Sequence, residues 1–535
     1  MSASVSIRKE VSIDEALQKS IGEFGWGQKK LFLLVSLPLI PAALQAFLLP
    51  FTLSDPAKQH WWECTAAAGE ACHSLFTQTS PDLCSLPRES WRWTRRSHSI
   101  ISEWNLLCGN SWAPQLVYTG FFVGLLIGTT AFGAFADRYG RRKGLLLACG
   151  LASLMACTNS LAPSFWWYLL LQSGTGIGVA GVWLLSFAMA TEPAGPAWQG
   201  HAGIATHLFF ATGACLASVL ALLVPNWRLA TFVAGIFMAA PLLLAAYLVE
   251  SPRWLLATGR KGEAAAGLAA IASLNKTHLP EAPLADMGVA LGALRPISDA
   301  FAHARLQRRI LLLLLSAFAL ALAYWVVLMM LGSAQGSLYL NQALAAAVEL
   351  PALLLTLLLL DRAGRRPVFS FALLQGGTSL LLCTLTFGWL QRMWLIASKV
   401  GVAAGLALLP MYAAELFPHS LRASVVDALQ QAARVGCCTA PGLLLVADKA
   451  PEFVPFLAVG AALLIPGVLS MTLPETLDSG SLDTGQELAS PRLRIKWPGI
   501  FRAQTLRQWL RPFKAHSGFS FSRLSETDMQ SNVLS

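Results

Sequence analysis

The sequence predicts an all-α membrane protein with twelve transmembrane helices in two six-helix halves. Hydrophobic residues make up 55% of the 535 residues and charged residues only 13%, whereas a soluble domain carries roughly 25% charged residues. The apolar residues fall in repeated stretches of about 20, the length that a helix needs to cross a bilayer. A charged turn, GAFADRYGRR at Gly133 to Arg142, lies between two such stretches, and a shortened copy, DRAGRR, follows at Asp361 to Arg366.

The repeated turn divides the chain into two similar halves, and internal repeats of this kind are typical of secondary transporters. We expect an N-terminal half over residues 31–249 and a C-terminal half over 310–473, joined by a mixed, basic linker over 250–309. A polar segment over 1–30 precedes them, and a basic, mostly disordered tail over 474–535 follows.

The apolar runs place the twelve helices in order along the chain. The first half has runs at 31–53, 113–136, 144–162, 165–191, 202–224 and 229–249, and the second at 310–331, 337–360, 367–389, 394–416, 424–446 and 453–473. The first 30 residues lack the short apolar core of a cleavable signal peptide, so the first run is expected to act as its own insertion signal. Three prolines interrupt that run, which neighbouring helices can accommodate: Pro38, Pro41 and Pro50.

A long polar loop over residues 54–112 follows the first helix and contains four of the ten cysteines, Cys64, Cys72, Cys84 and Cys108. An even number of cysteines in a loop outside the cytosol predicts two disulfides, for which three pairings are open. We place this loop outside the cell and both termini in the cytoplasm, because the charged turns, the linker and the tail are basic. The net charge of +10 then reflects orientation and contact with anionic lipids, and nucleic-acid binding is not expected.

Four motifs spread over nearly the whole chain resemble the major facilitator superfamily, and within it the solute carrier 22 family of organic ion transporters. They are IISEWNLLC at 100–108, the turn at 133–142, ESPRWL at 250–255, and AELFP at 414–418 with Arg422 and PET at 474–476. The resemblance implies the major facilitator fold and secondary-active or facilitative transport by alternating access around a central cavity. It also implies a multi-pass protein of the plasma membrane.

The charged motifs are the predicted gates, since in the resembling superfamily they latch the two halves in the outward-facing state. Asp137 lies at a helix end, where a carboxylate can pair with arginine or face the N-terminus of a neighbouring helix. Gly133 is expected to allow close helix approach, and Gly140 to permit a tight turn. The alternative is that the basic residues serve only as topology signals. The predicted gating residues are Gly133, Asp137, Arg138, Gly140, Arg141, Arg142, Asp361, Arg362, Gly364, Arg365, Arg366, Glu250, Arg253, Glu415 and Arg422.

Arg434 is the leading candidate for substrate binding. It falls near the middle of the eleventh predicted helix, and ionisable residues within the membrane are rare and functional by default. In the resembling family, anion carriers have arginine at this position and cation carriers have aspartate, so Arg434 favours an anionic substrate. The alternative is a structural ion pair with Asp427 on roughly the same face of the helix.

Three further residues are candidates for the same cavity. Tyr324 and Trp325 match an aromatic pair that lines the cavity in the resembling family, where a ring can stack on a planar organic ion; core or lipid packing is the alternative. Glu349, within the eighth helix, could contact Arg434 or a gate, or be structural. Lys399, at the start of the tenth helix, is expected to snorkel to an interface.

Other polar positions narrow the expected substrate. His201 and His207 could form a proton relay, but a hydrogen-bonded or interfacial role is favoured. The basic residue that many superfamily members carry in helix four is absent from the stretch 169–173, and Gln199 replaces the usual arginine after that helix. The positive charge expected in the cavity is thereby reduced to Arg434, which weakens the case for polyvalent anions.

The sequence therefore predicts a carrier of small organic ions, preferably anions, rather than an enzyme, with no cofactor or metal. There is no phosphate-binding GxxxxGK[ST] loop for ATP, and the adjacent Cys437 and Cys438 lack a redox or metal-binding spacing. Gly174, Gly176 and Gly178 lie inside an apolar run and indicate helix packing. The alternatives are a transport-inactive receptor or scaffold that acts through the loop, and a cation or zwitterion carrier. The expected partners are the substrate and the lipid bilayer, with the chain a monomer or weak oligomer.

Overall fold

The structure is a computed structural model that describes residues 11–65, 72, 75, 83–279, 304–333, 336–417, 419–447, 450–451 and 453–477. The predicted tail beyond Leu477 lies outside the described residues, as does part of the linker. Among the described residues, a helix occupies each of the twelve predicted positions. Eight stretches are long and apolar enough to cross a membrane, and Val454–Ser470 is a shorter apolar helix.

The first predicted span consists of three consecutive helices, which are interrupted near the prolines as the sequence predicts. Pro38 caps the second of them, and Pro50 lies in the first turn of the third. The three are α2 (Trp26–Ser36), α3 (Leu39–Phe47) and α4 (Leu49–Thr52). The other spans of the first half are α7 (Ala113–Tyr139), α8 (Arg141–Asn159), α9 (Phe165–Thr191), α10 (Pro196–Leu223) and α11 (Trp227–Leu243).

The second half repeats this order of helices. The eighth span of the chain, which is the second of this half, is divided into two helices. The first ends at Ala347, and the second begins at Glu349, two residues before Pro351. The spans are α16 (Ala304–Ser333), α17 (Leu338–Ala347) with α18 (Glu349–Ala363), α19 (Arg365–Cys383), α20 (Gly388–Leu416), α21 (His419–Ala447) and α22 (Val454–Ser470). Several helices, α7, α10 and α16 among them, run beyond the predicted apolar limits, because an apolar run marks the hydrocarbon thickness and the backbone can stay helical past it.

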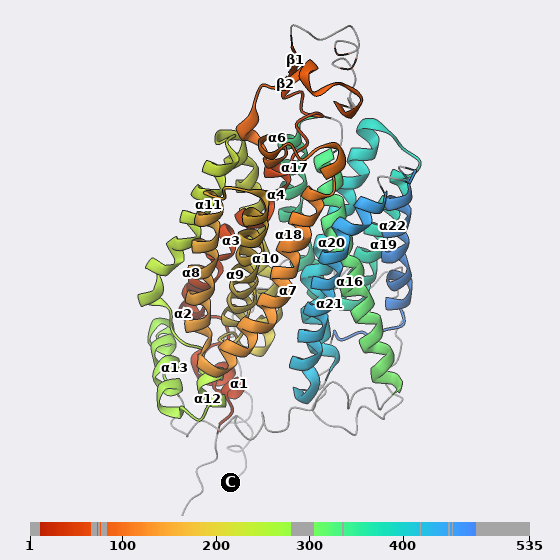
Figure 1. Ribbon diagram of the computed structural model, residues 1–535. Helices are drawn as coiled ribbons and strands as arrows, with labels where there is room; N and C mark the ends of the chain where they lie inside the picture. Colours follow the sequence, from red (N-terminus) through yellow and green to blue (C-terminus); the bar gives the residue numbers. More distant parts are fainter. Residues whose placement is uncertain are drawn as a thin grey trace, which may run out of the picture. The chain divides into compact units, whose positions relative to one another are not determined.

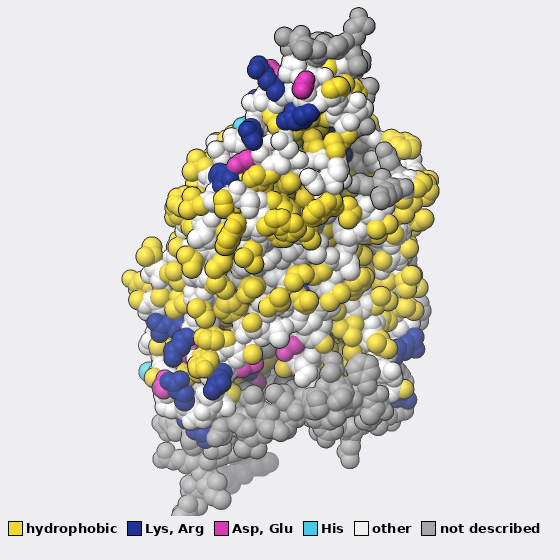
Figure 2. Space-filling view, viewed as in Figure 1, with side chains coloured by type: hydrophobic (Ala, Val, Ile, Leu, Met, Phe, Trp, Pro, Cys, Tyr) yellow, Lys and Arg dark blue, Asp and Glu magenta, His cyan; other side chains and the backbone are white. Residues whose placement is uncertain are grey.

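The helices pack as two sets that meet along the middle of the bundle (Figure 1). In the first set α9 packs against α7 and α8, and α3 against α10; in the second, α19 packs against α20 and α22, and α16 against α21. The sets meet where α7 packs on α21 and where α10 packs on α17 and α18. Figure 2 shows hydrophobic side chains over the middle of one face and charged side chains towards both ends, as a bilayer requires.

Glycines bring α7 and α9 close together. A Cβ on Gly124 would overlap the carbonyl oxygen of Ser173, and a Cβ on Gly176 would overlap that of Phe121. A Cβ on Gly178 would lie 2.6 Å from the backbone nitrogen of Ala152 in α8, so the predicted packing role of Gly176 and Gly178 is confirmed. The prediction for Gly133 is wrong, because a Cβ there would meet only a leucine methyl at 3.6 Å, an ordinary contact.

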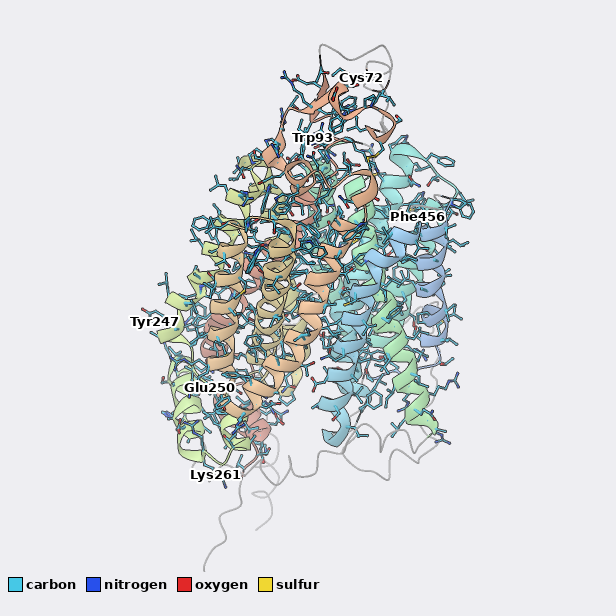
Figure 3. The ribbon with its side chains drawn as sticks, in the orientation of Figure 1. Cys72, Trp93, Tyr247, Glu250, Lys261 and Phe456 are labelled. Carbon is cyan, nitrogen blue, oxygen red and sulfur yellow. A yellow bond between two sulfur atoms is a disulfide. The ribbon has the colours of Figure 1, made fainter. Side chains whose placement is uncertain are left out.

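The loop after the first span carries two disulfides, as predicted, and the structure selects one of the three pairings: Cys64 with Cys72 and Cys84 with Cys108. Strands β1 (Trp62–Cys64) and β2 (Trp91–Trp93) pair antiparallel within it, and they lie at one end of the helices (Figures 1 and 3). The helix α6 (Ile100–Trp104) ties the loop to the bundle. There the Glu103 carboxylate accepts hydrogen bonds from Trp227 Nε1 at 2.6 Å and Arg228 Nη2 at 2.7 Å.

A small helical layer lies at the opposite end of the first half, in segments where the sequence predicted no helices. It comprises α1 (Ile13–Ala16), a π-helical turn (Leu17–Ile21), α12 (Pro252–Ala257) and α13 (Lys261–Asn275). Apolar residues of the N-terminal segment and of α13 share one core. An ion pair of 2.6 Å joins Asp14 of α1 to Arg253 of α12.

Candidate substrate cavity and charged gates

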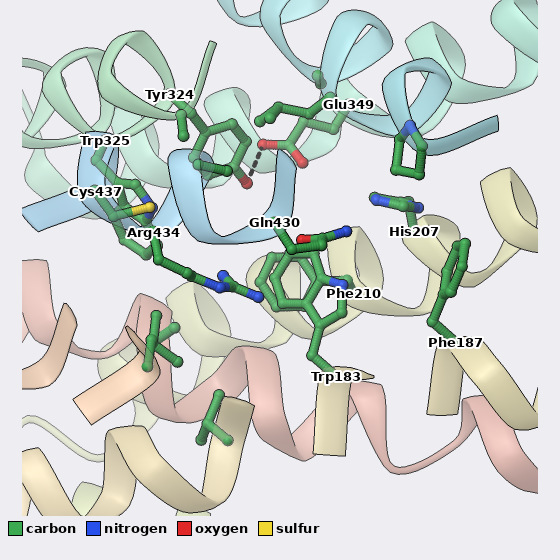
Figure 4. Close-up of a pocket in the computed structure, with 18 of the residues that line it drawn as sticks. Trp183, Phe187, His207, Phe210, Tyr324, Trp325, Glu349, Gln430, Arg434 and Cys437 are labelled. Atoms are coloured by element: carbon green, nitrogen blue, oxygen red, sulfur yellow. Dashed lines mark hydrogen bonds between the residues drawn. The ribbon is translucent and has the colours of Figure 1, made fainter. Parts of the chain in front are cut away.

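A cavity lies between the two sets of helices, and all four predicted substrate-binding residues line it: Arg434, Tyr324, Trp325 and Glu349 (Figure 4). Its wall is built from α3, α7, α9 and α10 of the first half and from α16, α18, α20 and α21 of the second. The free volume of about 80 Å³ is enough for several water molecules. Both halves therefore contribute to one central site.

Arg434 projects from the middle of α21 and is only 7% exposed. Its guanidinium carbon lies 5.0 Å from the ring centre of Trp183, and its Nε is buried without a hydrogen-bond partner. No ion pair to it is found within the described part of the chain. Asp427, the alternative partner, is exposed and lies in the field of Asp137 and Arg141 instead. A buried guanidinium without an acid is unfavourable.

Glu349 is held by two other buried residues rather than by Arg434. Lys399 Nζ lies 3.0 Å from Glu349 Oε1, which is an ion-pair distance, but the angles at the two groups are not those of a hydrogen bond. Tyr324 OH donates a hydrogen bond to the same oxygen at 2.9 Å. The ammonium also lies 2.9 Å from the centre of the Tyr324 ring. The predicted snorkelling of Lys399 is wrong, since this side chain is fully buried and the Glu349 carboxylate, rather than water, balances its charge.

Aromatic rings form much of the cavity wall. Trp183 and Phe210 lie with their ring centres 4.3 Å apart, and Trp325 packs 4.7 Å from Phe122. Tyr324 and Trp325 lie where the sequence predicts. Four other lining residues could not be identified from the sequence: Trp183, Phe187, Phe210 and Gln430. The helices α9 and α10 are apolar on most sides, so periodicity does not reveal which side faces the cavity. His207 also lines the cavity, and it makes the predicted kind of contact, with its Nδ1 3.2 Å from the carbonyl oxygen of Gly203.

The first charged turn forms a network of polar contacts around the start of α8. Arg141 pairs with Asp137 at 2.5 Å and with Glu192 at 3.4 Å. Glu250 Oε1 accepts a hydrogen bond from the backbone N–H of Arg142 at 3.0 Å, so this carboxylate caps the helix and interacts favourably with its dipole. Gly140, at φ 110°, makes the turn, and a Cβ there would overlap the Glu250 carboxylate.

The second charged turn repeats the acid–arginine pairs and the capping carboxylate of the first. Arg365 pairs with Asp361 at 3.4 Å and with Glu415 at 3.2 Å. Glu475 Oε1 accepts from the backbone N–H of Arg365 at 2.9 Å, and Gly364 has a φ of 94°. Glu415 is one of the predicted gating residues, whereas its counterpart Glu192 and the capping residue Glu475 were not predicted. Both lie in short motifs that the sequence displays, Glu192 in TEP at 191–193 and Glu475 in PET at 474–476.

At this end an ion pair between described residues joins the two halves. His201 Nε2, on α10, lies 2.9 Å from Asp361 Oδ2 on α18, so the acid of the second turn contacts both its own arginine and the opposite half. Beyond the turns, Arg253 donates to the backbone carbonyl of Glu192 at 2.6 Å.

The remaining predicted gating residues differ in their surroundings. Arg138 is exposed and stacks over Tyr139, with its guanidinium carbon 5.4 Å from the ring centre. Arg362 is exposed, Arg366 is buried, and Arg422 is half-buried near the start of α21.

Comparison of the sequence with known proteins identifies its family. The family described as "Sugar (and other) transporter" matches residues 110–408. An "Organic cation/carnitine transporter 4" of Arabidopsis thaliana is 31% identical over 89% of this chain and 91% of its own length. A "Solute carrier family 22 member 15-like" protein of Xenopus laevis is 29% identical over 91% of this chain and 98% of its own length. The chain belongs to the solute carrier 22 family of the major facilitator superfamily.

Solved structures confirm the fold of this solute carrier 22 member. The inward-open xylose transporter XylE from E. coli superimposes with a TM-score of 0.60 at 14% identity, covering 84% of this chain and 98% of that one. XylE bound to 6-bromo-6-deoxy-D-glucose, a proton:xylose symporter of the major facilitator superfamily, gives a TM-score of 0.57 at 15% identity, with 84% and 97% coverage. The family consists of membrane transporters, so the chain is a multi-pass membrane transporter of the major facilitator type.

Proposed function

We propose that this protein carries small organic anions across the plasma membrane by alternating access around the central cavity, with both termini in the cytoplasm. The observation that carries the proposal is Arg434, a buried guanidinium that lines the cavity and lacks an acidic partner among the described residues. A carboxylate on the substrate would supply the missing charge and the hydrogen-bond acceptors that a guanidinium fork prefers.

The balance of charge around the cavity supports an anion. Glu349 is the one acid among the lining residues, and the ammonium of Lys399 lies within ion-pair distance of it. Their charges compensate each other, which leaves the positive charge of Arg434 uncompensated. Charges act strongly on one another in a site of low dielectric constant. An anionic substrate beside Arg434 is therefore favoured over a cationic one.

Organic cations are the second candidate. Several relatives are named organic cation/carnitine transporters, and the rings of Trp183, Tyr324 and Trp325 could stack on a cationic group. Glu349 could attract such a group if Lys399 moved away from it. We rank this candidate second because the ion pair occupies that carboxylate and Arg434 repels cations.

The test is uptake of radiolabelled organic anions, cations and zwitterions in cells that express the chain, with the variants Arg434→Ala and Arg434→Asp. We expect saturable anion uptake that falls at least tenfold in Arg434→Ala, since a hydrogen-bonded charge pair in a buried site contributes about 1.5–3 kcal/mol. Lys143→Ala, which removes an exposed positive charge, is the matched control and should transport anions normally.

Three results would contradict the proposal. Uptake of cations but not anions by the unaltered chain would overturn the anion assignment. Anion uptake that survives Arg434→Ala would remove Arg434 from the site. Absence of all uptake, with surface biotinylation showing the protein at the plasma membrane, would favour a receptor or scaffold that acts through the disulfide-bonded loop.

A further inference from the structure

We propose that His207 determines substrate specificity within this cavity by accepting a hydrogen bond from the substrate. The carrier would then prefer organic anions that bear a hydroxyl or N–H group at the end remote from the carboxylate. This inference rests on the proposed function, because it concerns the same substrate and the same cavity.

The tautomer of His207 follows from its backbone contact. Its Nδ1 lies 3.2 Å from the carbonyl oxygen of Gly203, one turn earlier in α10. A carbonyl oxygen can only accept a hydrogen bond, so Nδ1 is assigned the hydrogen and Nε2 of the neutral ring is left as an acceptor. The unpaired guanidinium of Arg434 in the same cavity disfavours a second positive charge on this ring.

The imidazole faces the cavity. His207 is one of the lining residues, and Figure 4 shows its ring among Gln430, Phe210 and Phe187. Within the described residues, Nδ1 is the ring nitrogen with a hydrogen-bond partner. Nε2 is therefore free to accept a hydrogen bond from a bound molecule.

Trp183 relates this acceptor to the anion site. The guanidinium carbon of Arg434 lies 5.0 Å from the centre of the Trp183 ring, and the centre of the His207 ring lies 5.9 Å from it. A molecule lying beside the indole could thus present a carboxylate to Arg434 and a donor group to His207. Without a donor, it would leave Nε2 desolvated and unpaired, which is unfavourable.

Other polar residues of the wall cannot impose the same preference. The amide of Gln430 can both donate and accept, so it would tolerate either kind of group. The Glu349 carboxylate contacts Tyr324 and Lys399 through Oε1, and its negative charge opposes the approach of an anion. His207 is the neutral lining side chain whose remaining polar atom accepts and does not donate.

The experiment compares three radiolabelled acids of similar shape: benzoate, 4-hydroxybenzoate and 4-methoxybenzoate. The hydroxyl donates a hydrogen bond, whereas the methoxy group can only accept one. In the unaltered chain we expect the ratio of maximal rate to KM to be about five- to tenfold higher for 4-hydroxybenzoate than for the other two acids, the value of one buried hydrogen bond. His207→Leu should abolish this preference, and His207→Gln, which retains an acceptor, should keep part of it.

Phe210→Leu is the matched control, because it changes the volume of the wall next to Trp183 without removing a polar atom. It should shift transport of the three acids alike, and surface biotinylation should show each variant at the membrane. An unchanged preference in His207→Leu, or no preference in the unaltered chain while anions are transported, would overturn the role of His207 and leave the proposed function standing. No uptake of any acid would overturn both.

Discussion

At the scale of single residues, the membrane interior contains two kinds of buried charge. Lys399 and Glu349 are 0% and 3% exposed and compensate each other. Arg434 is also buried, at 7% exposed, and its guanidinium lies 5.0 Å from the centre of an indole ring. Every ionisable residue at this depth is a candidate functional residue, but Arg434 differs from the other two in having no acidic partner among the described residues.

We predict that Lys399→Met destabilises the protein by about 3–5 kcal/mol, because it leaves the Glu349 carboxylate buried without a partner. The double variant Lys399→Met with Glu349→Gln should recover much of that loss, since the amide carries no charge. The measurement is thermal unfolding of the purified protein in detergent. Lys143→Met is the control, as this lysine is exposed; equal stability of Lys399→Met and the unaltered chain would show that the pair contributes nothing.

At the scale of elements, two helices begin in the same way. The charged turns before α8 and α19 each place a glycine with positive φ beside a carboxylate that comes from just after the last helix of its half. These carboxylates, Glu250 and Glu475, accept hydrogen bonds from backbone N–H groups that have no partner within their helix. Each network therefore ties the third helix of a half to its sixth.

Gly140→Ala should lower the stability of the protein by about 1–3 kcal/mol. Its φ of 110° strains any residue with a Cβ, and the added methyl would displace the Glu250 carboxylate from the start of α8. Gly364→Ala should act similarly, because its Cβ would lie 2.7 Å from Glu475 Oε2. The measurement is thermal unfolding in detergent.

Gly150→Ala is the control for this pair of variants. It lies within α8, and a Cβ there meets nothing within 4 Å. Alanine is the better helix former by up to about 1 kcal/mol, so this variant should be as stable as the unaltered chain or slightly more stable. If Gly140→Ala behaved like Gly150→Ala, the positive φ would not be a constraint.

At the scale of the whole helical bundle, the two halves meet around the cavity and, in the described parts of the chain, through a small number of polar contacts. The ion pair of His201 with Asp361 and the hydrogen bond of 3.1 Å from Gln431 to Thr130 are two such contacts. Aromatic packing, such as Phe51 on Tyr339 at 5.4 Å, joins the halves towards the loop-bearing end. An alternating-access carrier needs contacts of this kind that can break on one side at a time.

We predict that His201→Ala opens the cavity more often towards the end with the charged turns, because it removes an ion pair that holds the halves together there. The readout is alkylation of Cys437, which lines the cavity, by an impermeant thiol reagent in inside-out vesicles. Its rate should rise several-fold in a background where the other free cysteines are alanine: Cys149, Cys157, Cys215, Cys383 and Cys438.

The control for this variant is His278→Ala, an exposed histidine of the linker, which should leave the rate unchanged. Asp361→Asn should raise the rate at least as much as His201→Ala, because it also removes the contact with Arg365. Adding His201→Ala to Asp361→Asn should change the rate little further, because both remove the same pair. A rate that stays constant in His201→Ala would exclude this pair from the closed gate.

Local features of the sequence were sufficient to predict the twelve helices, the two disulfides and the presence of charged turns. An apolar run predicts a membrane helix, whatever that helix packs against, and the two turns are visible as a repeat. Arg434 could be identified in the same way, since a charge in the middle of an apolar run is costly to bury and therefore rarely occurs without a function.

The tertiary structure alone decided which residues meet. The helices around the cavity are apolar on most sides, so the sequence does not show which face points inward. The partners of Lys399, the place of His207 and Trp183 in the cavity wall, and the contact of His201 with Asp361 all depend on packing between segments far apart in the chain. The pairing of the four loop cysteines is decided in the same way. Their positions in the sequence are compatible with all three pairings, and the folded loop is what brings Cys84 to Cys108.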